Sequence, residues 1–130
     1  MQEANAPSRG SKAGRIALWI LGALPALGVG VSGAAKFFPA THWQDYFVGW
    51  GYPSWFALVT GTLEVAGAIL TFVPRFARYG ASLLATIMAG AAVTLQLHRT
   101  TPPGWTPIGP LVYAVIFATV AVLWWRQQKR

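Results

Sequence analysis

Four long apolar stretches constrain the fold of this chain more than any other feature of its sequence. They run over residues 16–35, 55–73, 79–97 and 108–125. Each is close to the length that spans, as an α-helix, the roughly 30 Å hydrocarbon core of a bilayer. Three of them contain no charged residue, and the second contains one acid, Glu64. The sequence therefore predicts an all-α, polytopic membrane protein whose four transmembrane helices form an up-down-up-down bundle.

The composition agrees with a membrane protein. Only 10% of the residues are charged, whereas about a quarter are charged in an average soluble domain. Seven Trp, four Tyr and seven Phe suit the interface between hydrocarbon and headgroups. The absence of cysteine excludes disulfides, thiolate-bound metals and a covalently attached c-type haem. The net charge of +7 is spread between the apolar stretches rather than gathered on one face, so we expect the lipid bilayer, and no nucleic acid, as a partner.

The polar flanks divide the chain into three parts. Residues 1–14 are rich in Ala, Ser, Gly and Pro, and we expect them to form a disordered cytoplasmic tail. Residues 15–126 form the predicted transmembrane domain, and residues 127–130 a short basic cytoplasmic tail.

The basic residues predict the orientation of the bundle. One side carries Arg9, Lys12, Arg15, Arg75, Arg78, Arg126, Lys129 and Arg130, and the other carries Lys36 and Arg99. Because basic residues collect on the cytoplasmic side, we expect a multi-pass protein of the bacterial inner (cell) membrane with both termini in the cytoplasm. A signal peptide cleaved near residues 31–34 is the alternative. It is disfavoured because the apolar stretch is long for such a signal and because cleavage would leave an odd number of spans.

An aromatic segment, residues 37–52, lies between the first two stretches and is too short to cross a bilayer. Its composition predicts a short helix that lies in the outer membrane interface. Two interpretations are open. The favoured one is an aromatic belt that anchors the bundle, and the other is a lid over a site between the helices.

Glu64 is the most informative residue because it lies at the centre of the second stretch. Small and hydroxyl residues surround it at helical spacing: Thr60, Gly61, Gly67, Ala68 and Thr71. This pattern predicts that Glu64 faces the bundle interior. No Lys or Arg lies at the same depth in any stretch, so we expect desolvation to keep Glu64 a neutral acid near pH 7. It then either handles a proton or orients a ligand, or it donates a hydrogen bond that fixes helix packing.

Five further residues are candidates for a ligand or proton site with Glu64. Thr60 and Tyr113 are its predicted partners because they lie at the nearest depth. Lys36 follows the first stretch, and with the stretches placed as above it is roughly 16 Å from Glu64 along the membrane normal. Only a shifted register or a chain of water molecules would join the two. Thr94 and His98 share a helical face that we expect to line the interior.

Several short motifs resemble the DoxX-like family of small four-helix membrane proteins. They are Ser32-Gly33-Ala34-Ala35-Lys36-Phe37, Gly51-Tyr52-Pro53-Ser54-Trp55-Phe56, Gly61-Thr62-Leu63-Glu64-Val65-Ala66-Gly67-Ala68, Pro74-Arg75 and Met88-Ala89-Gly90-Ala91. The resemblance covers roughly residues 29–99 and implies the four-helix fold. Family members are similar to subunits associated with quinone-linked oxidoreductases and redox-stress assemblies, and Lys36 and Glu64 correspond to the family's charged positions.

Three functions remain open from the sequence. The first is a noncatalytic membrane subunit of an oxidoreductase, which lends a quinone pocket between Glu64, Tyr113 and the aromatic segment. The second is a small proton-coupled transporter or a lipid- or small-molecule-binding protein that uses Glu64. The third is a membrane assembly or packing factor, and a homo-oligomer is compatible with all three. No built-in cofactor and no metal site are expected, and three acids with two histidines offer no nucleophile–base pair for an independent enzyme.

Overall fold

The computed structural model of the protein describes residues 12–38, 42–98 and 107–128. Its elements are α1 (Lys12–Ala35), α2 (Trp43–Gly49), α3 (Trp55–Phe72), the 3₁₀ helix η3 (Pro74–Phe76), α4 (Ala77–Leu97) and α5 (Ile108–Gln128). Within these ranges the chain has no strand. Four helices are long and apolar enough to cross a membrane: α1, α3, α4 together with η3, and α5. The predicted all-α, polytopic fold is confirmed.

Two predicted boundaries differ from the structure. Helix α1 begins at Lys12 and α5 continues to Gln128, so residues 12–14 and 127–128 are helical rather than parts of the tails. Residues 1–11 and 129–130 of the predicted tails lie outside the described residues.

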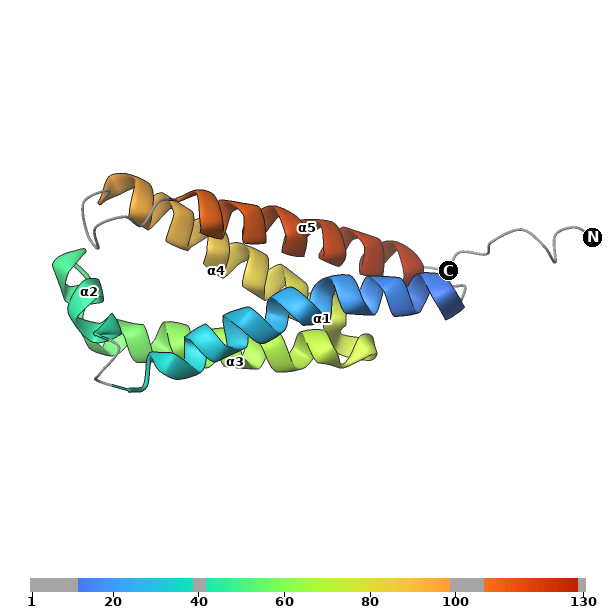
Figure 1. The fold of residues 1–130 in the computed structure, drawn as a ribbon, viewed down its shortest axis with the longest axis horizontal. Coiled ribbons are helices and arrows are strands. Elements are labelled where there is room, and N and C mark those ends of the chain that lie inside the picture. Colours follow the sequence, from blue (N-terminus) through green and yellow to red (C-terminus); the bar gives the residue numbers. More distant parts are fainter. Residues whose placement is uncertain (1–11, 39–41, 99–106, 129–130) are drawn as a thin grey trace, which may run out of the picture.

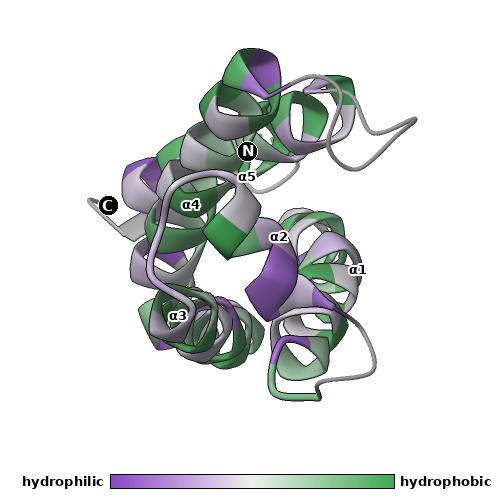
Figure 2. Ribbon diagram, turned by 90° about the vertical axis from the view of Figure 1, so that its left-hand side faces the viewer, coloured by the Kyte–Doolittle hydropathy of each residue, from purple (hydrophilic) through white to green (hydrophobic). Residues whose placement is uncertain are grey.

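The helices form two packed pairs that diverge toward one end of the bundle. Helix α1 packs against α3, and α4 packs against α5. Figure 1 shows the pairs meeting where α1 begins and α5 ends, which we name the closed end, and separating toward α2, which we name the capped end. Seen from the capped end, α2 lies across the space between the pairs (Figure 2).

Apolar side chains fill the bundle at the closed end and near its middle. The cluster at the closed end joins Leu18 of α1 to Val120 and Trp124 of α5. The cluster near the middle is built around Phe117 and Leu84, which are fully buried. At the capped end the core is aromatic instead: Phe47 and Trp50 pack against Ala57 and Leu95.

Small residues bring α1 and α3 into close contact. A Cβ atom added to Gly33 would lie 2.8 Å from the carbonyl oxygen of Gly61, and one added to Gly61 would lie 2.6 Å from the carbonyl oxygen of Gly33. Such close backbone approach through small residues drives helix association in lipid, where the hydrophobic effect adds little. The contact fixes the register of the two helices, with Gly33 at the level of Gly61.

The turn between α2 and α3 depends on a glycine. Gly51 has a φ of 95°, a left-handed conformation that costs little only for glycine. The backbone N–H of Gly51 donates to the carbonyl of Val48, and that of Tyr52 donates to the carbonyl of Phe47. This tight turn reverses the chain and places Tyr52 beneath α2, beside the interior of the bundle.

Candidate functional site

A cavity of about 770 Å³ lies between the two helix pairs at the capped end. Helices α1, α3, α4 and α5 contribute its walls, and α2 with the following turn contributes aromatic side chains that cover it. Five of the six residues predicted for the site line this cavity: Lys36, Thr60, Glu64, Thr94 and Tyr113. Residues that lie far apart in the sequence therefore meet in a single chamber.

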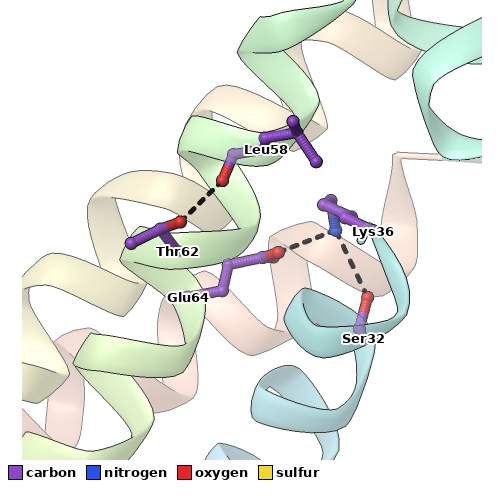
Figure 3. A network of polar contacts seen from close by, with 5 residues as sticks. All are labelled: Ser32, Lys36, Leu58, Thr62 and Glu64. Carbon is purple, nitrogen blue, oxygen red and sulfur yellow. Dashed lines mark hydrogen bonds and ion pairs between the residues drawn. The ribbon is translucent and has the colours of Figure 1, made fainter. Parts of the chain in front are cut away.

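Lys36 and Glu64 form an ion pair in the cavity wall. The Lys36 Nζ atom lies 2.7 Å from Glu64 Oε1, and the two side chains are 4% and 3% exposed. Figure 3 shows both side chains reaching across the gap between α1 and α3. The ion pair thus joins the turn after α1 to the middle of α3 within the cavity wall.

The predicted separation of Lys36 and Glu64 is wrong, and the register of α1 explains why. Gly33 packs against both Gly61 and the Cβ of Glu64, so the end of α1 lies level with the middle of α3. Lys36 follows Gly33 by three residues. A Cβ atom added to Gly61 would lie 3.1 Å from the Cβ atom of Lys36. A cation therefore lies at the depth of Glu64, contrary to the expectation that no Lys or Arg would lie there.

The ammonium group of Lys36 has two more partners. Its Nζ atom donates to Ser32 Oγ at 3.4 Å and lies 4.0 Å from the ring centroid of Trp43. Trp43 opens α2, so this cation–π contact links α2 to the ion pair. One buried side chain thus joins α1, α3 and α2.

Two other predicted residues occupy the cavity wall without the predicted contact to Glu64. Thr60 is half-buried on α3, one turn before Glu64. Tyr113 of α5 is 38% exposed, its ring stacks on Phe117 with centroids 6.1 Å apart, and its hydroxyl lies near Gly28 of α1. The partner of Glu64 is Lys36, and Thr60 and Tyr113 line the cavity without a contact to the acid.

Thr94 and His98 do not share the interior as predicted. Thr94 is buried, and its hydroxyl forms a 2.9 Å hydrogen bond with the hydroxyl of Tyr52. His98 is not among the residues that line the cavity. Helix α4 ends at Leu97, and the backbone of His98 (φ −128°, ψ 59°) has left the helical conformation. The backbone N–H of His98 still donates to the carbonyl of Thr94, but His98 does not take part in the cavity wall.

The aromatic segment contributes more to the site than an anchoring belt would. Trp43, Phe47 and Trp50 line the cavity, together with Tyr52 and Phe56 beyond α2. Their rings contact one another, with Phe47 5.3 Å from Trp50 and Tyr52 5.2 Å from Phe56 between centroids. The arrangement fits the interpretation as a lid. The density of aromatic residues in a segment too short to cross the bilayer was the signal for it.

The cavity has the size and lining of a binding site for an organic molecule. Ligand sites are concave and mostly apolar, with a few placed polar groups and volumes of roughly 300–1,000 Å³. Here apolar and aromatic side chains predominate, and the polar groups are one ion pair, the hydroxyls of Ser32, Tyr52, Thr60, Thr94 and Tyr113, and the indole N–H groups of Trp43 and Trp50. Among the described residues no three His, Asp or Glu side chains come together as metal ligands.

Comparison with known proteins places the chain in a family. The model of the DoxX-like family matches residues 20–122, which include α3, α4, most of α1 and α5, and all residues that line the cavity. The chain is 35% identical over 65 residues to the uncharacterized protein YdgD of Bacillus subtilis, an alignment that covers 48% of this chain and 54% of YdgD. The chain thus matches about half the length of this curated relative. No solved structure matches. Because the family model spans most of the chain, the protein belongs to the DoxX-like family of membrane proteins.

Proposed function

We propose that the protein is a noncatalytic membrane subunit of a quinone-linked or redox-stress oxidoreductase system, and that its cavity binds the headgroup of a quinone. The observation that carries the proposal is the cavity of about 770 Å³ between the helix pairs, with an aromatic lid and hydroxyl groups in its walls.

The chemistry of the walls suits a flat, polar ring with an apolar substituent. Aromatic rings of α2 provide surfaces on which a quinone ring stacks. The hydroxyl groups of Thr60 and Tyr113 provide donors for its two carbonyl oxygens. Lys36 is already engaged by Glu64, Ser32 and Trp43, so in this proposal the ion pair holds the wall and lid in place rather than donating to the ligand.

The proposal also assigns a membrane and an orientation. Of the described basic residues, Lys12, Arg15, Arg75, Arg78 and Arg126 lie toward the closed end, and Lys36 toward the capped end. By the positive-inside rule the closed end faces the cytoplasm of a bacterial cell, with both termini there. The quinone site then lies toward the outer leaflet of the inner (cell) membrane, and a separate subunit carries the redox cofactor.

Titration of the purified protein with a short-chain ubiquinone and a short-chain menaquinone tests the proposal. Quenching of tryptophan fluorescence reports occupancy because Trp43 and Trp50 line the cavity, and native mass spectrometry identifies the bound molecule. We expect Tyr113→Phe and Thr60→Val each to weaken binding roughly fivefold, the equivalent of one hydrogen bond. Thr119→Val is the matched control, because the Thr119 hydroxyl is exposed and donates to the Val115 carbonyl.

These titrations and two further measurements separate this function from its alternatives. If neither quinone binds the folded protein, the proposal is overturned, and equal binding by Tyr113→Phe, Thr60→Val and the control overturns it as well. If the protein is instead a proton-coupled transporter, Glu64→Gln should abolish the pH-driven uptake of its substrate into proteoliposomes. The protein can also be released gently from native membranes and its bound partners identified. If only bulk lipid or further copies of the chain are found, without a cofactor-bearing subunit, the association with an oxidoreductase is contradicted.

A further inference from the structure

A second hollow, separate from the cavity, lies at the closed end of the bundle. It has a volume of about 400 Å³ and is lined by Lys12, Arg15, Ile16 and Trp19 of α1, Pro74 of η3 and Trp124 of α5. We name it the basic groove. Two cations thus share one depression with two indole rings.

The walls of the basic groove are held in place by contacts within the bundle. The indole N–H of Trp19 donates to the carbonyl oxygen of Phe72 at 2.7 Å, and its ring packs on that of Phe72 with centroids 6.4 Å apart. Trp124 is 2% exposed and belongs to the apolar cluster of the closed end. The groove therefore has a fixed apolar floor.

The cations of the basic groove lack acidic partners within the described part of the chain. Lys12 and Arg15 are exposed, and neither takes part in the ion pairs found there, which are Lys36–Glu64 and His42–Asp45. Both acids of the described residues, Glu64 and Asp45, are thus engaged toward the capped end. Arg75, Arg78 and Arg126 add positive charge at the closed end, so an anion from the surroundings must balance it.

The position of the groove indicates which anion. The ends of transmembrane helices lie at the level of the headgroups, where indole rings also prefer to lie. Basic pockets between helix ends suit anionic lipid headgroups, since the phosphate meets the cations while the glycerol and first acyl carbons meet the apolar floor. We propose that the basic groove binds the headgroup of an anionic phospholipid, with Lys12 and Arg15 contacting its phosphate.

Lipid binding to the full-length protein in an uncharged detergent tests this proposal. Native mass spectrometry follows titration with phosphatidylglycerol, with phosphatidylcholine of the same acyl chains and with inorganic phosphate. We expect phosphatidylglycerol to bind preferentially, and the double variant Lys12→Gln/Arg15→Gln to weaken its binding roughly thirtyfold, given two lost phosphate contacts. Arg75→Gln/Arg126→Gln is the matched control, since it removes the same charge from the same end without changing the lining of the groove.

Each other outcome overturns the proposal. Equal loss in the two double variants indicates diffuse attraction rather than a site. Equal binding of phosphatidylcholine and phosphatidylglycerol shows that the negative charge of the headgroup does not determine which lipid binds. Binding of inorganic phosphate in place of the lipid, with the same dependence on Lys12 and Arg15, indicates a site for soluble anions. Circular dichroism and thermal unfolding verify that the variants are folded.

Discussion

The Nζ atom of Lys36 lies 2.7 Å from Glu64 Oε1, with the lysine at the end of α1 and the acid in the middle of α3. The two side chains bury opposite charges at one point of the cavity wall. Removing one partner of such a pair leaves an unpaired buried charge, whereas removing both costs far less. The pair can therefore be examined by single and double substitution.

Replacement of Glu64 by glutamine should destabilise the protein, because the ammonium group of Lys36 loses its counter-charge. We expect the free energy of unfolding to fall by about 3 kcal/mol, measured by denaturant titration in detergent. Lys36→Met should cost a similar amount, and Lys36→Met/Glu64→Gln should recover most of the loss. Additive losses in the double variant would show that the two charges are not coupled.

The contact between α1 and α3 should tolerate no side chain at Gly33. A Cβ there meets Glu64 Cβ at 2.7 Å and the Gly61 carbonyl oxygen at 2.8 Å, so Gly33→Ala must push the helices apart. We expect a loss of about 1–3 kcal/mol in the free energy of unfolding. Gly90→Ala is the control, since nothing lies within 4 Å of its added Cβ, and it should cost nothing. Equal effects of the two substitutions would refute the close contact.

The hydrogen bond between Tyr52 and Thr94 should couple the turn after α2 to α4. Tyr52→Phe removes one hydroxyl of the 2.9 Å contact, and we expect a loss of about 1 kcal/mol in the free energy of unfolding. Thr94→Val should have a similar effect. A double-mutant cycle of the two substitutions measures the interaction between the two hydroxyl groups. A coupling energy of zero would mean that the hydrogen bond contributes nothing to stability.

Substitution of Trp43 should loosen the lid while leaving the bundle intact. Trp43→Leu removes the ring that lies 4.0 Å from Lys36 Nζ, a contact of a type worth about 0.5–2 kcal/mol. Amide hydrogen exchange in α2 should accelerate roughly tenfold, with no change in α4. Trp55→Leu serves for comparison because Trp55 is 60% exposed. Unchanged amide hydrogen exchange in α2 would show that the contact between Trp43 and Lys36 does not stabilise the position of α2.

The sequence predicted the number, order and approximate limits of the membrane-spanning helices because each is a long apolar run between polar flanks. It also predicted that Glu64 faces inward, which its 3% exposure confirms. The ion pair could not be predicted in the same way. Placing every span at the same depth puts Lys36 far from Glu64, and only the packing of Gly33 against Gly61 sets the actual register.

Details of packing explain the other differences. His98 is the residue at which α4 ends, and its φ and ψ angles differ from helical values. Aromatic composition marked residues 37–52 as unusual, but it does not tell whether rings face lipid or a cavity.

The placement of the two charges has a consequence for how the protein enters the membrane. Lys36 follows the end of α1, so α1 inserts alone with its cation still able to reach the headgroups. Helix α3 carries Glu64 within its apolar length, and an acid near the centre of an isolated helix raises the cost of insertion. Because synthesis delivers α1 first, its lysine is available as a counter-charge when α3 arrives. We therefore expect the first helix to act as an internal insertion partner for the second, so that biogenesis, as well as the finished bundle, depends on the pair.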